Sequence, residues 1–320
     1  MKYELKKVSG DASFREFYRL KKNNKTSIIV SAKKEKFKNL AVYTAINNIL
    51  RLNKINAPKL LSNNYKNNII EISDLGEQSF YDYIISKKNK FNAYKSLIRL
   101  LIRIQKIKIK KNYKFKKLKI KIPKYTLTNL HKESDLFFDW YLKYFLKNKK
   151  IHKIKKFLRS ELNKVYKRLN YENDTFVHRD FHISNVMIKK KKLGLIDSQD
   201  AIIGNPLYDV SSLIDDVRIK LPNKFQKKLL DFYHQKSKLK NDKIQKLKND
   251  FDILSVQRNL KILGIFVRLH KRDKKDNYLK FLPHTWKLIE RRLGNPVFKD
   301  LKILFYKHLP IKKLKKLNKI

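Results

Sequence analysis

The residues best suited to chemistry lie near the middle of the chain, between positions 176 and 197. Asp180 is followed five positions later by Asn185, and Asp197 ends the next apolar run, residues 193–196. In phosphoryl transfer, one carboxylate accepts the proton of the attacking hydroxyl, while an amide oxygen and a second carboxylate hold Mg²⁺ against the nucleotide phosphates. Mg²⁺ prefers oxygen ligands and usually binds one or two carboxylates together with substrate phosphate. The spacing therefore predicts a phosphotransferase with Asp180 as catalytic base and Asn185 and Asp197 as magnesium ligands.

Two histidines flank the predicted base and suggest other chemistry. His178 and His182 resemble zinc ligands, but the chain has no Cys and no further clustered His, and two His alone do not complete a zinc site. We therefore interpret His178 as structural support, a packing and hydrogen-bonding residue of the loop. Turn and capping roles are the ordinary alternative for an Asp and an Asn in a loop. The order of the three predicted roles along the chain favours the catalytic interpretation.

Composition limits the class of protein. The chain has 320 residues with 42% hydrophobic content, enough for a sizeable core in one large or two closely packed domains. It contains no run of eighteen apolar residues, and no apolar segment follows its first residues, so we expect neither a membrane span nor secretion. The absence of Cys excludes disulfides and thiolate catalysis. These features predict a cytoplasmic enzyme, in the compartment where ATP is found.

The charge is strongly positive. Seventy-nine Lys and Arg against 28 Asp and Glu give a net charge of +51, which by itself suggests a polyanion partner. The excess is spread along the whole chain and accompanies many Asn and Ile, a profile that also fits a coding sequence of low G+C content. We therefore expect a solvated basic surface, without a specific nucleic-acid site, that still binds nucleic acid weakly at low salt.

The elements that must position these residues fall into two predicted domains. Residues 1–76 are expected to form a small β-rich N-terminal nucleotide-binding lobe with strands near 14–20, 26–30 and 69–72 and a helix over 37–52. Residues 77–320 are expected to form a larger, mainly helical lobe with the catalytic loop and the substrate site. Helical patterns cover 91–107 and 151–169, start at Leu136, and continue after Pro206 to about residue 307. Residues 106–124 form a Lys/Ile-rich connector, either a basic loop or an edge strand, and the loop is favoured.

Candidate phosphate-binding residues lie in the N-terminal lobe. Gly10 can adopt positive φ in the turn before the first long strands, and Ser13 can donate its hydroxyl and amide to a phosphate oxygen. A kinase cleft also usually has a strand Lys paired with a helix Glu. Here no Glu lies within the following helix, and Arg15, Lys33 or Lys34 could supply the cation. In the other lobe, Asp209 is interpreted as structural support that accepts backbone amides of the catalytic loop, or as a helix cap.

Four segments resemble the aminoglycoside phosphotransferase-like kinases, and within them the bacterial anomeric kinases of N-acetylmuramate and N-acetylglucosamine. The similarity extends from about residue 8 to residue 310, and two flanking segments, 135–142 and 256–266, support the subgroup. The four segments are Ser9-Gly10-Asp11-Ala12-Ser13-Phe14-Arg15, Ser73-Asp74-Leu75-Gly76, His178-Arg179-Asp180-Phe181-His182-Ile183-Ser184-Asn185 and Ile196-Asp197-Ser198-Gln199-Asp200-Ala201.

This resemblance implies an α+β, two-lobed protein-kinase-like fold and ATP-dependent, Mg²⁺-dependent phosphorylation of a sugar hydroxyl. In the subgroup the acceptor is the anomeric C1 hydroxyl, and the sugar 1-phosphate enters cell-wall recycling. The resemblance also implies that Glu71, Ile72 and Asp74 belong to a hinge that holds adenine through backbone groups. Ser198 departs from the aromatic residue that relatives often have after the metal-binding Asp. We expect a monomer with a small-molecule sugar substrate.

Three alternatives remain open. The first is a kinase of another small hydroxyl substrate, such as an aminoglycoside, a choline-like amine or homoserine. A cationic substrate of this kind would require an acidic pocket. The one obvious acidic pair, Asp215-Asp216, is expected on a helix surface. The second is an inactive binding protein with the kinase scaffold. The third is a polyanion-binding module.

Overall fold

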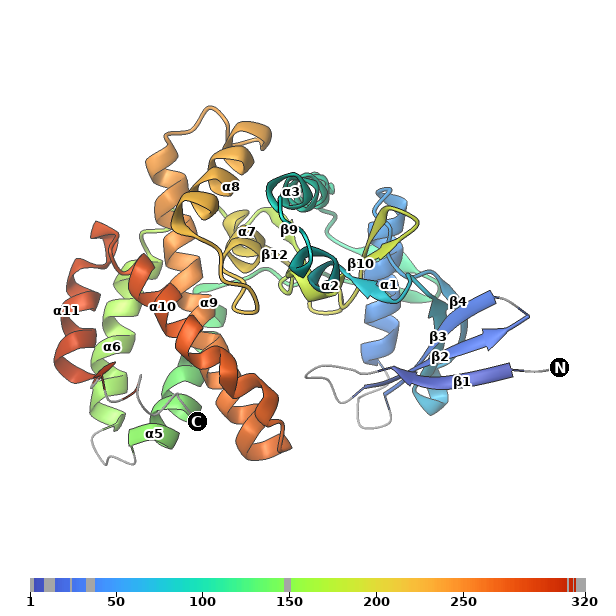
Figure 1. Cartoon of the computed structure of the whole chain (residues 1–320), viewed down its shortest axis with the longest axis horizontal. Helices are drawn as coiled ribbons and strands as arrows, with labels where there is room; N and C mark the ends of the chain where they lie inside the picture. Colours follow the sequence, from blue (N-terminus) through green and yellow to red (C-terminus); the bar gives the residue numbers. More distant parts are fainter. Residues whose placement is uncertain are drawn as a thin grey trace. The chain divides into compact units, whose positions relative to one another are not determined.

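The computed structural model describes residues 3–8, 15–23, 25–32, 38–146, 151–309, 311–312 and 314 (Figure 1). Contacts between residues group the chain into two compact units. Unit 1 comprises Met1–Pro123 and Thr175–Ile203, and unit 2 comprises Lys124–Asp174 and Gly204–Ile320. The segment with Asp180, Asn185 and Asp197 thus belongs to the same unit as the N-terminal sheet. The predicted lobe boundary after residue 76 stays a prediction.

Unit 1 contains an antiparallel sheet of five strands in the order β1-β2-β3-β5-β4. Its strands are β1 (Tyr3–Val8), β2 (Glu16–Lys22), β3 (Lys25–Ser31), β4 (Leu60–Asn64) and β5 (Ile69–Ser73). The register pairs Lys22 of β2 with Lys25 of β3, and Asn23, directly after β2, adopts a φ of 47°, which Asn tolerates better than most residues. The predicted strands near 14–20, 26–30 and 69–72 are confirmed.

Helix α1 (Lys38–Leu52) packs on this sheet through its apolar face (Figure 1). Val30, Ile70 and Ile72 of the sheet form a buried cluster with Leu40 and Tyr43 of the helix. Burial of such side chains stabilises the packing by about 1.5–3 kcal/mol per residue. The helix predicted over residues 37–52 is confirmed, and the cluster that it shares with β3 and β5 holds it against the sheet.

The remaining elements of unit 1 include those that contain the catalytic segment, residues 176–197. The hairpin of β10 (Val186–Lys189) and β11 (Lys192–Leu195) extends to β6 (Gln78–Ser79), and β9 (Thr175–Val177) pairs with β12 (Ile202–Gly204). Helices α2 (Phe80–Ile85) and α3 (Phe91–Gln105) and the 3-10 turn η3 (Ile183–Asn185) complete this part. The connector 106–124, for which a loop is the favoured prediction, contains a short hairpin of β7 (Tyr113–Phe115) and β8 (Leu118–Ile120).

Unit 2 is helical. The 30-residue helix α9 (Ile244–Asp273) packs against α4 (Leu127–Leu136), the π-helical segment η2 (Phe137–Leu142), α7 (Leu207–Ile214) and α10 (Leu282–Arg292). Its other elements are α5 (Lys143–Leu146), α6 (Ile151–Tyr166), α8 (Asn223–Lys236), η4 (Asp276–Phe281), η5 (Pro296–Phe298) and α11 (Lys299–His308). The helix expected to start at Leu136 begins earlier, at Leu127, where Thr126 caps it through a reciprocal bond with Asn129.

The architecture is α+β, with antiparallel strands near the N-terminus and helices in most of the remainder. Within the described ranges, no helix combines the length and the apolar character that a membrane crossing requires.

Candidate active site

The catalytic loop, residues 178–185, follows β9 and is held together by hydrogen bonds to its own backbone. The carbonyl oxygen of Asp180 accepts the amide of His182 at 3.1 Å and the side-chain Nδ2 of Asn185 at 3.0 Å. The amide of Asn185 in turn donates to the carbonyl of His182 at 3.0 Å. These bonds bring Asp180 and Asn185 into one turn, and the half-buried carboxylate of Asp180 takes part in none of them. The donor side of the Asn185 amide is occupied, so its oxygen is the atom left for a cation.

Asp197 is attached to this loop through the residue before it. The amide of Ile196 donates to the carbonyl of Asn185 at 3.0 Å, and the carbonyl of Ile196 accepts Nε2 of His178 at the same distance. Asp197 itself has a φ of 63°, a left-handed conformation that costs a non-glycine residue about 1–3 kcal/mol and is concentrated at functional sites. The structure thus brings the three predicted chemical residues together within unit 1.

The electrostatics of the site fit a cation. Burial raises the pKa of Asp197 to about 6, and the nearby carboxylate of Asp180 acts in the same direction, while Gln199 and Arg15 act against it. Two neighbouring carboxylates repel each other, and a bound divalent ion relieves that repulsion. The described residues contain no cluster of three His, Cys, Asp or Glu side chains. A magnesium site of one carboxylate, one amide oxygen and nucleotide phosphates requires none.

His178 is completely buried behind the loop. Burial lowers its pKa to about 4, so the imidazole is neutral near pH 7 and donates from Nε2 to the Ile196 carbonyl. This bond joins the start of the catalytic loop to the residue before Asp197. The supporting role of His178 stays a prediction, with which this contact is compatible.

Helix α1 reaches the same segment through a bond that sequence reasoning missed. Ser198 Oγ donates to Asn47 Oδ1 at 2.6 Å, and both side chains are buried. One helical turn earlier, Tyr43 lies under the guanidinium of Arg15, with 5.4 Å between the Arg15 Cζ and the ring centre. Two features of the sequence could have indicated this bond. The helix lacks a Glu, and the residue directly after Asp197 is small and polar.

The structure describes only some of the other predicted nucleotide-binding residues. Gly10, Ser13 and Lys33 lie outside the described residues. Arg15 is buried and its charge acts to lower the pKa of Asp197, and its contact with phosphate stays a prediction.

The predicted hinge lies at the end of β5. Glu71 and Ile72 lie within that strand, which pairs with β3 on one edge and β4 on the other. Their backbone groups pair within the sheet, and the contact of this segment to adenine stays a prediction. Asp74, directly after the strand, accepts Arg19 Nε at 2.7 Å and the amide of Gly76 at 2.9 Å.

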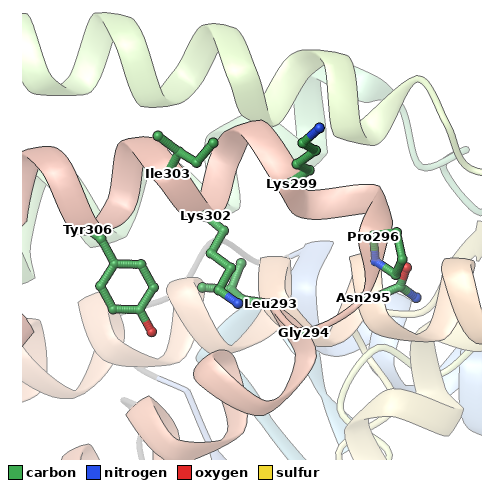
Figure 2. A pocket seen from close by; sticks show the side chains of 8 residues that line it. All are labelled: Leu293, Gly294, Asn295, Pro296, Lys299, Lys302, Ile303 and Tyr306. Atoms are coloured by element: carbon green, nitrogen blue, oxygen red, sulfur yellow. The ribbon is translucent and has the colours of Figure 1, made fainter.

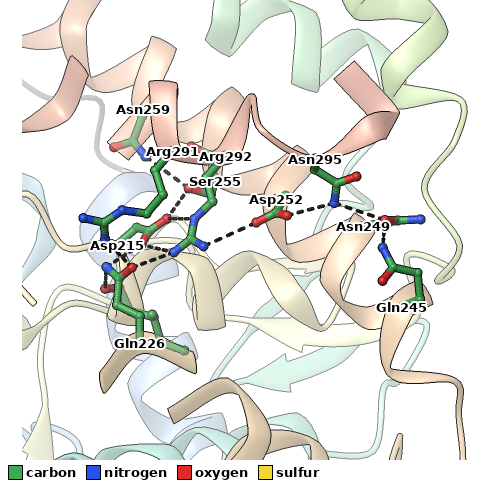
Figure 3. Close-up of polar contacts among 11 residues, drawn as sticks. Asp215, Gln226, Gln245, Asn249, Asp252, Ser255, Asn259, Arg291, Arg292 and Asn295 are labelled. Atoms are coloured by element: carbon green, nitrogen blue, oxygen red, sulfur yellow. Dashed lines mark hydrogen bonds and ion pairs between the residues drawn. The ribbon is translucent and has the colours of Figure 1, made fainter. Parts of the chain in front are cut away.

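Unit 2 contains the remaining acidic residues of interest. Asp209 lies fully buried in the first turn of α7, and its bonding to the catalytic loop stays a prediction. The prediction that Asp215 and Asp216 lie on a helix surface is wrong, because each is 1% exposed. Asp215 accepts both Nε and Nη2 of Arg292 (Figure 3), and Asp216 pairs with Arg218 at 3.2 Å. Both carboxylates are already neutralised, so they do not form an acidic pocket for a cationic substrate.

A surface hollow of about 640 Å³ lies in the same unit, beside α11 (Figure 2). It contains none of the predicted site residues, and its charged side chains are two lysines. The lining residues are Leu293, Gly294, Asn295, Pro296, Lys299, Lys302, Ile303 and Tyr306.

Comparison with known proteins identifies the family of the chain. The model of the phosphotransferase enzyme family matches residues 4–242, which is most of the chain. The chain belongs to this family. It is therefore a phosphotransferase that acts on a hydroxyl group, and the catalytic segment lies inside the matched region.

One curated relative and two solved structures are similar over most of their lengths. The N-acetylmuramate/N-acetylglucosamine kinase of Pseudomonas aeruginosa is 27% identical over 299 residues, 90% of this chain and 83% of its own. The ethanolamine kinase of Plasmodium vivax gives a TM-score of 0.64 at 14% identity, covering 93% of this chain and 84% of that one. A thermostable aminoglycoside phosphotransferase APH(4)-Ia, in complex with AMP-PNP and hygromycin B, gives 0.63 at 11% identity, covering 91% and 95%. These neighbours establish the protein-kinase-like fold.

Proposed function

We propose that the chain is an ATP- and Mg²⁺-dependent sugar kinase that phosphorylates the anomeric C1 hydroxyl of N-acetylmuramate or N-acetylglucosamine. It would act in the cytoplasm as a monomer, in the recycling of cell-wall sugars. The observation that carries the proposal is the grouping of Asp180, Asn185 and Asp197 by direct backbone bonds. The relative from Pseudomonas aeruginosa, named for both sugars and similar over 90% of this chain, supports the substrate class.

In this proposal the chain contributes positioning and charge. The Asp180 carboxylate accepts the proton of the sugar hydroxyl and orients it toward the terminal phosphate. Asn185 and Asp197 would hold Mg²⁺, which, when bound, neutralises charge on the transferred phosphoryl group. Asp197 must be ionised to do so, and a bound cation lowers its raised pKa.

The nucleotide is assigned to the N-terminal part of unit 1. Arg15 is the cation proposed to contact the phosphates, together with Lys33, and Gly10 and Ser13 are proposed to cover them through backbone and hydroxyl groups. Asp74 follows the strand end and is proposed to contact adenine through its backbone, in the hinge that also contains Glu71 and Ile72. Gly76 has a φ of 101°, so the chain turns there in a conformation that other residues rarely adopt.

The test is identification of the product. Purified protein is incubated with MgATP and each N-acetyl sugar, and the products are analysed by phosphorus and proton NMR. An α-anomeric phosphate from either sugar is expected. A panel with choline, ethanolamine, homoserine and an aminoglycoside is run in parallel. Phosphorylation of one of these and of neither sugar would contradict the proposal.

A further inference from the structure

Arg258 is a buried cation with no counter-charge. Its side chain lies on α9 with 5% of the residue exposed, and its Nη1 is buried without a hydrogen-bond partner. In the part of the chain that the structure describes, no ion pair joins this guanidinium to a carboxylate. Such a group is expensive to bury, because desolvation of an unpaired charge costs several kcal/mol.

The register of two helices shows what Arg258 faces. Lys261 Nζ contacts Tyr208 Oη at 3.3 Å in the first turn of α7, and Ser255 Oγ donates to Asp215 just beyond the last turn. The helices are therefore antiparallel. Arg258 is midway between Ser255 and Lys261, and at about 100° per residue it also lies midway between them around α9.

The middle of α7 opposite this position carries two small residues, Ser211 and Ser212. Both are fully buried, and the Ser212 hydroxyl also has no hydrogen-bond partner in the described residues. Both side chains are small and polar. The buried guanidinium of Arg258 on α9 and the unsatisfied hydroxyl of Ser212 on α7 therefore lie at the same level along the two packed helices.

The acidic residues on either side of Arg258 already form ion pairs with other cations. Glu133 accepts Lys261 Nζ at 3.1 Å, and Asp215 is bound by both donor groups of Arg292 (Figure 3). Neither carboxylate is left to pair with Arg258. The contrast with Arg292 is informative, because the two arginines belong to the same helical unit and only one has its charge balanced within it.

We propose that Arg258 binds the carboxylate of an acidic amino-sugar substrate such as N-acetylmuramate, with Ser212 as a neighbouring hydrogen-bond donor. The inference rests on the proposed function and adds its specificity: N-acetylmuramate carries a lactyl carboxylate, whereas N-acetylglucosamine is neutral. Arginine matches a carboxylate with two parallel donors, and such charge-assisted bonds are strong when desolvated. The phosphate group of a sugar 1-phosphate offers Arg258 similar oxygens. Measuring the binding of a sugar 1-phosphate beside that of N-acetylmuramate separates the phosphate from the carboxylate.

The first experiment asks whether the guanidinium is structural. Arg258→Leu and Arg292→Leu are compared with the wild type by denaturant unfolding without ligand. Arg258→Leu is expected to be at least as stable as the wild type, because it removes an unpaired buried charge. Arg292→Leu, the matched control, is expected to lower the midpoint clearly, because it leaves Asp215 buried without its partner. A similar loss in Arg258→Leu would overturn the inference, and Arg258→Lys then shows whether the loss follows charge or shape.

The second experiment measures binding of both sugars and of N-acetylglucosamine 1-phosphate by calorimetry. In Arg258→Leu, affinity for N-acetylmuramate is expected to fall by about 10- to 100-fold, with N-acetylglucosamine changed by less than about 3-fold. An equal loss for both sugars, no loss at all, or a loss confined to the sugar phosphate would each contradict the carboxylate assignment. Wild-type protein that binds neither sugar would instead contradict the proposed function, so the two failures are distinguishable.

Discussion

At the scale of single residues, the proposed chemistry depends on Asp180. Its backbone carbonyl is fully engaged with His182 and Asn185, so the loop geometry does not need the carboxylate. A substitution that changes only the side chain should therefore leave the loop intact and remove the proton acceptor.

We expect Asp180→Asn to lower turnover by about 10²- to 10⁴-fold, the usual contribution of a general base, with nucleotide affinity largely kept. Steady-state kinetics and calorimetry with MgATP measure the two effects. Unchanged turnover would remove Asp180 from the mechanism, and a parallel loss of nucleotide affinity would assign it a binding role.

The grouping of residues that are close in the amino-acid sequence can be predicted, and contacts that depend on tertiary partners cannot. The spacing of Asp180, Asn185 and Asp197 indicates that they lie together, as the structure shows, and their chemical roles stay predictions. Nothing local indicates that Asn47 bonds to a residue 151 positions away, or that Arg258 Nη1 is buried without a hydrogen-bond partner among the described residues. The surface prediction for Asp215 fails because Arg292, which makes its burial possible, lies 77 positions further along.

At the scale of elements, α1 is coupled to the predicted metal residue through Asn47 and Ser198. Replacing Ser198 by Ala leaves the buried Asn47 oxygen without a donor, at a cost of about 1–3 kcal/mol. We expect Ser198→Ala to lower both stability and MgATP affinity, and the added Asn47→Leu to recover part of the stability.

A double-mutant cycle on unfolding free energy and on MgATP affinity measures this coupling. Thr126→Ala is a suitable control, because it removes a helix cap in unit 2 and should lower stability by about 1 kcal/mol with unchanged affinity. Additive effects of Ser198→Ala and Asn47→Leu would show that the bond does not position Asp197.

Gly264 determines how closely α9 approaches α4. A Cβ at this position would overlap the carbonyl group of Leu136, whose backbone atoms cannot move aside as a flexible side chain can. Gly264→Ala is expected to destabilise the protein by about 1–3 kcal/mol or more, as overpacked sites do. Gly294→Ala is the control, since its nearest neighbour is the Arg291 carbonyl at 3.2 Å, and thermal unfolding compares the two. Equal stability of both variants would contradict the close packing.

Long periodic helices and apolar strands can be predicted from the sequence, and short or polar elements cannot. Helices α3 and α6 have strong apolar stripes and lie where their patterns predict. Strand β4 is mostly polar and exposed, and the β7–β8 hairpin has only three residues in each strand, so neither has a pattern that stands out from a loop. The start of α4 depends on the Thr126 cap. Because a cap is polar, a search for apolar periodicity does not find it.

At the scale of the whole molecule, the net charge of +51 affects association more than chemistry. Binding of non-specific DNA should fall by at least about 10-fold between about 50 mM and about 200 mM salt, because it depends on counterion release. Titration of a labelled duplex at several salt concentrations measures this. Affinity that persists at the higher salt would point to a built nucleic-acid site.

The central claim is that Asp180, Asn185 and Asp197 surround one divalent ion at a nucleotide phosphate. Calorimetry of ATP binding to wild type and Asp197→Ala, each with and without Mg²⁺, tests it most directly. We expect Mg²⁺ to strengthen ATP binding to the wild type and to have no effect on Asp197→Ala. Equal, Mg²⁺-dependent affinity in both proteins would contradict the claim.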